Sequence, residues 1–187
     1  MTNSDLLAMS VSDMAFLVDK LHEDCSPMQF VRELTKNSIE AIQRTSDGTG
    51  EVVWDLDWFR FDQTSGAQSK LCLIDNGFGM TGAEMVKYIN QLSSSIHQQT
   101  TTGNFGVGAK ISAAPLNPHG MLYLSWKDGT GYMIHLFKDP STRQYGLRRF
   151  ETGEFWSVVD DEVRPKQITK DGTMVVLLGD AEEIDTM

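Results

Sequence analysis

The fold is decided by one stretch of sequence, Phe30-Val31-Arg32-Glu33-Leu34-Thr35-Lys36-Asn37-Ser38-Ile39-Glu40-Ala41. Apolar and small residues, including Leu34 and Ala41, recur in it at the spacing of a helix face that meets a core. Glu33 and Asn37 are four residues apart, so they lie one above the other on the neighbouring face. We therefore expect a half-buried helix that carries a carboxylate and an amide along one ridge.

This polar pair has two interpretations. An amide oxygen such as that of Asn37 can ligate Mg²⁺, which prefers hard oxygen ligands and keeps several waters. A carboxylate one turn away, Glu33, can orient or deprotonate a water molecule. Taken alone, the pair is more simply a solvated helix face, because polar residues are mostly exposed.

Elements on both sides of this helix indicate an α+β fold, with helices layered on one face of a mixed, mostly antiparallel sheet. Ser26 is the expected N-cap of the central helix, with Pro27 at its first position. Thr81 and Glu84 form a capping box for a later helix. Asp128-Gly129-Thr130-Gly131 is typical of a β-hairpin turn. The expected helices span 12–22, 26–44, 81–92 and 109–116, and the expected strands span 51–61, 71–75, 121–127, 132–138, 146–150, 154–159 and 173–178.

Composition excludes several classes of protein. The 187 residues carry 16 Lys and Arg against 26 Asp and Glu, a net charge of −10, which argues against a nucleic-acid-binding or anionic-membrane surface. No apolar run is long enough to cross a membrane, and the N-terminus carries no basic segment of a secretory signal. Two cysteines, Cys25 and Cys72, lack metal spacing, and Cys72 lies in an apolar run. We expect a cytoplasmic protein with no membrane partner and with Cys72 as a reduced core thiol.

Two glycine-containing stretches are candidates for ligand contact. Asp75-Asn76-Gly77-Phe78-Gly79-Met80 follows a buried strand, so Asp75 can present a carboxylate at the floor of a pocket while the glycines allow close backbone approach. A plain turn is an equally good interpretation. Thr102-Gly103-Asn104-Phe105-Gly106-Val107-Gly108-Ala109-Lys110 precedes a helix, where backbone N–H groups bind anions. Lys110 either meets a phosphate or is a solvated surface lysine, and the residues alone slightly favour the second. Asp171-Gly172-Thr173 taken alone indicates a turn and a strand.

The order of these four motifs resembles the GHKL ATPases, which include gyrase B, the ninety-kilodalton heat-shock chaperones, MutL and the histidine kinases. The similarity covers roughly residues 26–178 and implies the Bergerat fold, a two-layer α/β sandwich that holds ATP and Mg²⁺ under a flexible lid. By this resemblance Glu33 is the general base, Asn37 the Mg²⁺ ligand and Asp75 the acceptor for the adenine amine. The other nucleotide-binding residues that the resemblance implies are Gly77, Gly79, Met80, Gly103, Asn104, Phe105, Gly106, Val107, Gly108, Lys110 and Thr173.

The presence of Glu33 distinguishes between the branches of this family. Histidine kinases have the asparagine but usually lack this carboxylate, and no helical hairpin with a phosphorylatable histidine is visible here, so the resemblance favours a slow ATP hydrolase. A non-hydrolysing ATP-sensing module is the alternative, and a histidine kinase catalytic domain is less favoured. The motifs do not choose among the chaperone, MORC, gyrase B and topoisomerase VI types.

We expect one ATP-binding domain over residues 1–187, with an N-terminal arm and helix before residue 26. Related hydrolases use a second domain that donates a cation to the γ-phosphate. The chain is therefore expected to be the N-terminal part of a longer protein, or a stand-alone member with weak turnover. The expected partners are ATP or ADP and, by resemblance, a second copy of the chain in a nucleotide-dependent homodimer.

Overall fold

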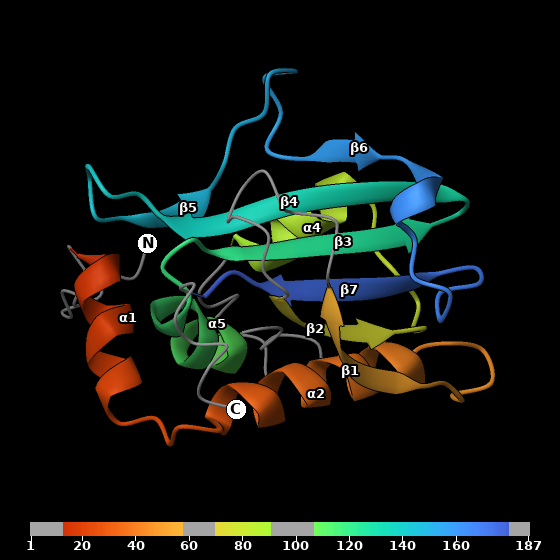
Figure 1. Ribbon diagram of the computed structural model, residues 1–187, viewed down its shortest axis with the longest axis horizontal. Helices are drawn as coiled ribbons and strands as arrows, with labels where there is room; N and C mark the ends of the chain where they lie inside the picture. Colours follow the sequence, from red (N-terminus) through yellow and green to blue (C-terminus); the bar gives the residue numbers. More distant parts are fainter. Residues whose placement is uncertain (1–12, 58–69, 91–106, 180–187) are drawn as a thin grey trace, which may run out of the picture.

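The computed structural model describes residues 13–57, 70–90 and 107–179 (Figure 1). Within these residues one seven-stranded sheet has the strand order β1-β2-β7-β3-β4-β5, with β6 also pairing with β4. The strands are β1 (Val52–Asp57), β2 (Lys70–Asp75), β3 (Met121–Lys127), β4 (Thr130–Lys138), β5 (Tyr145–Leu147), β6 (Ser157–Val159) and β7 (Gly172–Leu177). The α-helices are α1 (Met14–Glu23), α2 (Gln29–Gln43), α4 (Gly82–Ile89) and α5 (Val107–Ala113), and the 3-10 turns are η1 (Ala114–Leu116) and η2 (Asp161–Val163).

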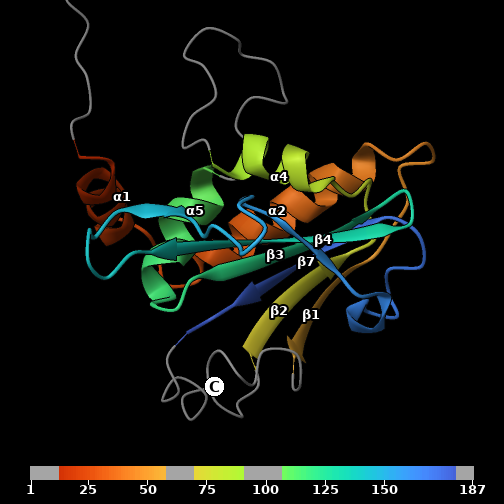
Figure 2. The same cartoon turned by 90° about the horizontal axis from the view of Figure 1, so that it is seen from above.

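The helices α2, α4 and α5 lie on one face of the sheet, as Figure 2 shows from above. A core between the two layers joins Leu34 of α2 and Met85 of α4 to Tyr123 and Val175 of the central strands. Every strand pair among the described residues is antiparallel. The predicted α+β class, with helices covering one face of a mostly antiparallel sheet, is confirmed.

Several local predictions are also confirmed. The Thr81 hydroxyl accepts a hydrogen bond from the Glu84 N–H, and the Glu84 carboxylate accepts one from the Thr81 N–H, so both halves of the capping box are present. Asp128 and Gly129 have φ angles of 50° and 82° between β3 and β4, the left-handed pair that a two-residue hairpin turn requires. Cys72 is buried and forms no disulfide bond.

The start of α2 differs from the prediction. Its N-cap is Met28, which makes no side-chain capping hydrogen bond, and the helix begins at Gln29. The Gln29 N–H instead donates to the Ser26 carbonyl at 3.0 Å, and the Gln29 side chain accepts from the Ser26 N–H at 3.3 Å. These bonds close a turn before the helix, so the expected start at Ser26 and Pro27 is wrong by two residues. The strands β5 and β6 are likewise shorter than expected.

The sheet brings three distant segments into one row. Asp75 at the end of β2 is in register with Thr173 of β7, and Thr173 is in register with Ser125 of β3. These strands are neighbours although their residues lie about 50 to 100 positions apart in the chain. The row faces the helices, because Asp75 meets Ser38 of α2.

Parts of some expected elements fall outside the described residues, namely 58–61 of the first strand and 91–92 of the third helix. Among the helices that the structure describes, none has both the length and the apolar character needed to cross a membrane.

Candidate functional site

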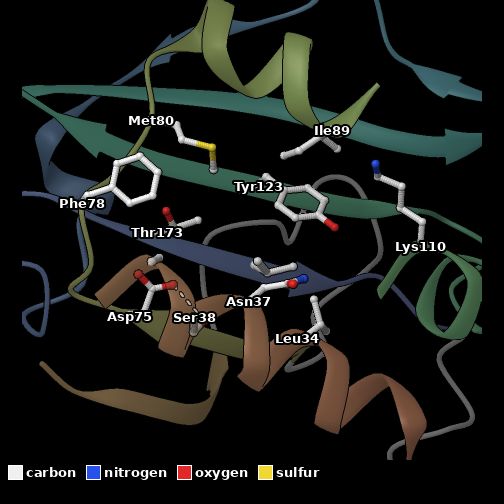
Figure 3. A pocket seen from close by; sticks show the side chains of 12 residues that line it. Leu34, Asn37, Ser38, Asp75, Phe78, Met80, Ile89, Lys110, Tyr123 and Thr173 are labelled. Atoms are coloured by element: carbon white, nitrogen blue, oxygen red, sulfur yellow. Dashed lines mark hydrogen bonds between the residues drawn. The ribbon is translucent and has the colours of Figure 1, made fainter. Parts of the chain in front are cut away.

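A pocket opens between the helix layer and the sheet, with an empty volume of about 530 Å³ that includes solvent at its mouth (Figure 3). Its lining residues come from α2, α4, α5 and three central strands, and from the stretch between β2 and α4. They are Leu34, Asn37, Ser38, Ala41, Asp75, Phe78, Met80, Ile89, Lys110, Tyr123, Thr173 and Val175. The pocket thus contains residues of all four motifs that the sequence singled out.

Asp75 is the centre of one end of the pocket. Its carboxylate accepts hydrogen bonds from the Ser38 hydroxyl at 2.8 Å and from the Gly77 N–H at 3.0 Å. We call Ser38, Asp75, Gly77 and Thr173 the Asp75 end. Burial raises the pKa of the Asp75 carboxyl to about 6, although its hydrogen bonds with Gly77, Ser38 and Thr173 act in the opposite direction. The carboxylate is therefore mainly ionised at neutral pH. Its burial is unfavourable for folding, because the charge has lost most of its hydration.

Backbone packing fixes the two glycines beside Asp75. A Cβ on Gly77 would lie 2.8 Å from the Ala41 carbonyl carbon and 2.9 Å from an Asp75 carboxylate oxygen. Gly79 has a φ of 63°, and a Cβ there would collide with the Trp126 carbonyl oxygen. Both positions exclude any side chain, because α2 and β3 approach the turn too closely.

Met80 and Thr173 are linked through a residue that the sequence analysis did not select, Ser125. The Ser125 hydroxyl accepts from the Met80 N–H at 2.8 Å, lies 2.9 Å from the Thr173 hydroxyl and donates to the Gly172 carbonyl at 3.0 Å. Ser125 is fully buried. It therefore holds the turn after Asp75 onto the sheet and fixes Thr173 beside Asp75.

The part of the pocket between Ser38 and Lys110 has different properties (Figure 3). We call Asn37, Lys110 and Tyr123 the Asn37 end. Asn37 is half-buried on α2 and lines the pocket. Lys110 of α5 is 3% exposed, and its ammonium group donates to the Tyr88 carbonyl at 3.4 Å. Burial lowers the pKa of the Lys110 ammonium to about 8. The interpretation of Lys110 as a solvated surface lysine is wrong, because α5 packs this side chain under the end of α4.

Glu33 lies beside the pocket and is not among the residues that line it. It precedes Asn37 by one turn of α2, and its carboxyl group packs against Gly108 in the first turn of α5. A Cβ on Gly108 would lie 2.7 Å from the Glu33 carboxyl carbon. The structure thus places Glu33 between the Asn37 end and the start of α5, where Val107 is the first helical residue.

Four of the predicted nucleotide-binding residues, Gly103, Asn104, Phe105 and Gly106, lie outside the described residues. Of the others, the pocket gathers Asn37, Asp75, Met80, Lys110 and Thr173. Gly77 and Gly79 shape the turn beside it, and Gly108 meets Glu33.

Sequence reasoning missed several pocket residues. The sequence analysis did not select Ser38 of α2, whose hydroxyl donates to Asp75. The Phe78 ring lines the pocket with the Arg44 guanidinium 5.4 Å and the Lys127 ammonium 5.6 Å from its centroid. Tyr123 lies in an apolar strand. Its hydroxyl, a polar group within a run of buried residues, was the feature that could have identified it as a pocket residue.

The side chains available as metal ligands limit which metal ion the site can hold. Within the described ranges no three His, Cys, Asp or Glu side chains come together as metal ligands. A single amide oxygen from Asn37 fits Mg²⁺, which takes few protein ligands and completes its shell with water and substrate phosphates. It does not fit a closed structural zinc site.

Comparison with known proteins agrees with this arrangement. No curated protein matches the chain closely enough to be reported as a relative. Residues 25–145 match the model of the family of histidine kinase-, DNA gyrase B- and HSP90-like ATPases. This match covers more than half of the chain, and the sheet with its helix layer is the Bergerat fold of that family. The chain therefore belongs to the histidine kinase-, gyrase B- and HSP90-like ATPase family, and its domain is of the ATP-binding type.

Proposed function

We propose that this domain binds ATP together with Mg²⁺ and hydrolyses it slowly, using nucleotide binding and release as a conformational switch. One observation carries the proposal. Asp75 and Asn37 line a single pocket, and Glu33 stands one helical turn from Asn37. This arrangement supports the assignment of Asp75 as base acceptor, Asn37 as metal ligand and Glu33 as general base for one bound nucleotide.

The adenine belongs at the Asp75 end. Its exocyclic amine donates to the Asp75 carboxylate, a charge-assisted hydrogen bond in a buried site. Thr173 stands next to Asp75 across the strand pair and supports the same contact. Met80 and Phe78 supply apolar surface for the faces of the base.

The phosphates belong at the Asn37 end, where Lys110 provides a buried cation. The Asn37 side-chain oxygen would hold Mg²⁺, which supplies neutralising charge to the phosphates when bound. Hydrolysis then requires a group that accepts a proton from the attacking water as it adds to the terminal phosphorus and ADP leaves. We assign this step to Glu33, the carboxylate one turn of α2 before Asn37.

The test compares binding with turnover in Glu33→Gln. We expect the variant to bind a non-hydrolysable ATP analogue in calorimetry within about threefold of the parent, and to bind it more tightly with Mg²⁺ than without. Its phosphate release should fall by a factor of about 10² to 10⁴, the usual contribution of a general base.

Glu40→Gln is the matched control. Glu40 is a carboxylate on the same helix, paired with Lys36 at 3.7 Å, and it does not line the pocket. We expect this variant to retain turnover. Parental turnover in Glu33→Gln would show that the base has been assigned wrongly.

An ATP-sensing module without hydrolysis is the second candidate function. It is favoured by the packing of Glu33 against Gly108, outside the residues that line the pocket. Binding with no phosphate release from the parent, even at high protein concentration, would select this function. Size-exclusion chromatography with and without ATP and Mg²⁺ tests the proposed nucleotide-dependent homodimer in either case.

A further inference from the structure

Tyr123 places a polar atom in the pocket that the proposed function has not yet used. The residue lies in the middle of β3 and is 8% exposed. No hydrogen bond joins its hydroxyl to another residue that the structure describes, and the fully buried polar atoms that lack a partner there are Trp126 Nε1 and Arg164 Nε. The Tyr123 hydroxyl is therefore open to the space of the pocket, where a group that arrives with a ligand can reach it.

The orientation of Tyr123 identifies which part of the ligand this group is. Tyr123 is in register with Val175, two residues from the Ser125 and Thr173 pair that marks the Asp75 end. Figure 3 shows the ring between Met80 and Lys110, with its hydroxyl directed toward the side that holds Asn37 and Lys110. A nucleotide whose base reaches Asp75 would therefore carry its sugar past the ring and bring its first phosphate to the hydroxyl.

Charge and protonation agree with an anion at this position. Among the residues that line the pocket, the single carboxylate is Asp75 and the single ammonium group is Lys110. Burial raises the pKa of Tyr123 above its usual value, so the hydroxyl keeps its proton and acts as a donor. A neutral donor that lines the same pocket as a buried cation is suited to a phosphate oxygen.

We propose that Tyr123 is a phosphate-binding residue of this site, whose hydroxyl donates a hydrogen bond to the phosphate group nearest the sugar of the bound nucleotide. This inference rests on the proposed function, because it takes the base to lie at Asp75. It adds to that function a contact from the floor of the sheet that none of the four motifs contains.

The experiment compares adenosine with AMP, which differ by this one phosphate, in the parent and in Tyr123→Phe. Calorimetry should show AMP affinity falling about tenfold in the variant, the usual loss for a hydrogen bond to a charged group, with adenosine affinity within about twofold. The melting temperature of the free variant should stay level, because the substitution removes a hydroxyl that makes no hydrogen bond to another described residue.

Tyr145→Phe is the matched control. The Tyr145 hydroxyl donates to the Asp19 carboxylate at 2.8 Å, and Tyr145 is not part of the pocket lining. We expect this variant to melt at a lower temperature and to bind AMP like the parent.

Three outcomes would overturn the inference. Equal AMP affinity in the parent and Tyr123→Phe would show that the hydroxyl does not contact a phosphate. An equal loss for adenosine and AMP would assign the contact to the sugar or the base. A marked fall in melting temperature would show that the hydroxyl serves the fold. Failure of the proposed function would appear separately, as a parent protein that binds neither AMP nor ATP.

Discussion

The two ends of the pocket are built on different principles. At the Asp75 end the polar groups satisfy one another, through the Ser38 hydroxyl, the Gly77 N–H and the Ser125 bridge to Thr173. At the Asn37 end the Tyr123 hydroxyl makes no hydrogen bond to another described residue and is open to the pocket, and the Lys110 ammonium donates to the Tyr88 carbonyl of α4.

The glycines near the two ends of the pocket show the same difference. Side chains at Gly77 and Gly79 would meet backbone atoms, whereas a side chain at Gly108 would meet the movable end of Glu33. We therefore expect the Asp75 end to be preformed and the Asn37 end to be completed by the ligand. Each prediction below tests one side of this difference.

The largest expected effect is that of Gly79→Ala. The new Cβ would collide with the Trp126 carbonyl oxygen of β3, and the φ of 63° is unfavourable for alanine. Because the obstacle is sheet backbone, we expect the free energy of unfolding to fall by at least about 3 kcal/mol. Urea denaturation followed by circular dichroism measures this loss.

Gly48→Ala is the control that separates backbone strain at positive φ from a steric collision of the new Cβ. Gly48 has the same φ of 63°, and a Cβ there has nothing within 4 Å. It should cost only about 1 kcal/mol, the usual penalty of the left-handed conformation. Similar losses for the two variants would mean that the turn after Asp75 can yield, and the Asp75 end could no longer be called rigid.

Asp75→Asn should weaken binding while it stabilises the free protein. Loss of a charge-assisted hydrogen bond to the base predicts about 10- to 100-fold weaker ATP binding. The raised pKa of Asp75 sets the effect on folding. An unfolded aspartate loses its proton near pH 3.8 and the folded one near pH 6, so between these values the folded state binds more protons.

The stabilising effect of the protonated form is therefore complete below about pH 3.8 and is lost as the pH rises through about 6. Asparagine resembles the protonated side chain and does not titrate. We expect Asp75→Asn to be more stable than the parent by up to about 3 kcal/mol at pH 7.5, and equal to it near pH 4. Denaturation across this range measures the difference, and a constant difference would show that Asp75 does not carry this cost.

Local features of the fold could be predicted from sequence, because their causes lie within a few residues. The Thr81 capping box, the Asp128-Gly129 turn and the strand that ends at Asp75 are of this kind. The start of α2 was misplaced, because the Ser26 turn uses the same residues as a helix cap.

The contacts that build the site were less accessible to sequence reasoning. Ser38 and Asp75 are 37 positions apart, Met80 and Ser125 are 45, and both contacts depend on which elements become neighbours. A local pattern does not specify that β7 lies between β2 and β3, which is what aligns Ser125 and Thr173 with Asp75. The burial of Lys110 was missed for the same reason, since the end of α4 supplies its partner.

The smallest expected effect on stability is that of Gly108→Ala, which tests the Asn37 end. The new methyl group would meet the Glu33 carboxyl, and this flexible side chain can turn away, so unfolding should change by less than about 1 kcal/mol. Turnover should nevertheless fall at least about tenfold, because a displaced base no longer reaches its water. Phosphate release measured beside urea denaturation compares the two effects. Parental turnover would mean that the contact of Glu33 with Gly108 does not position the base, whereas a loss of stability like that of Gly79→Ala would show that both ends of the pocket are equally rigid.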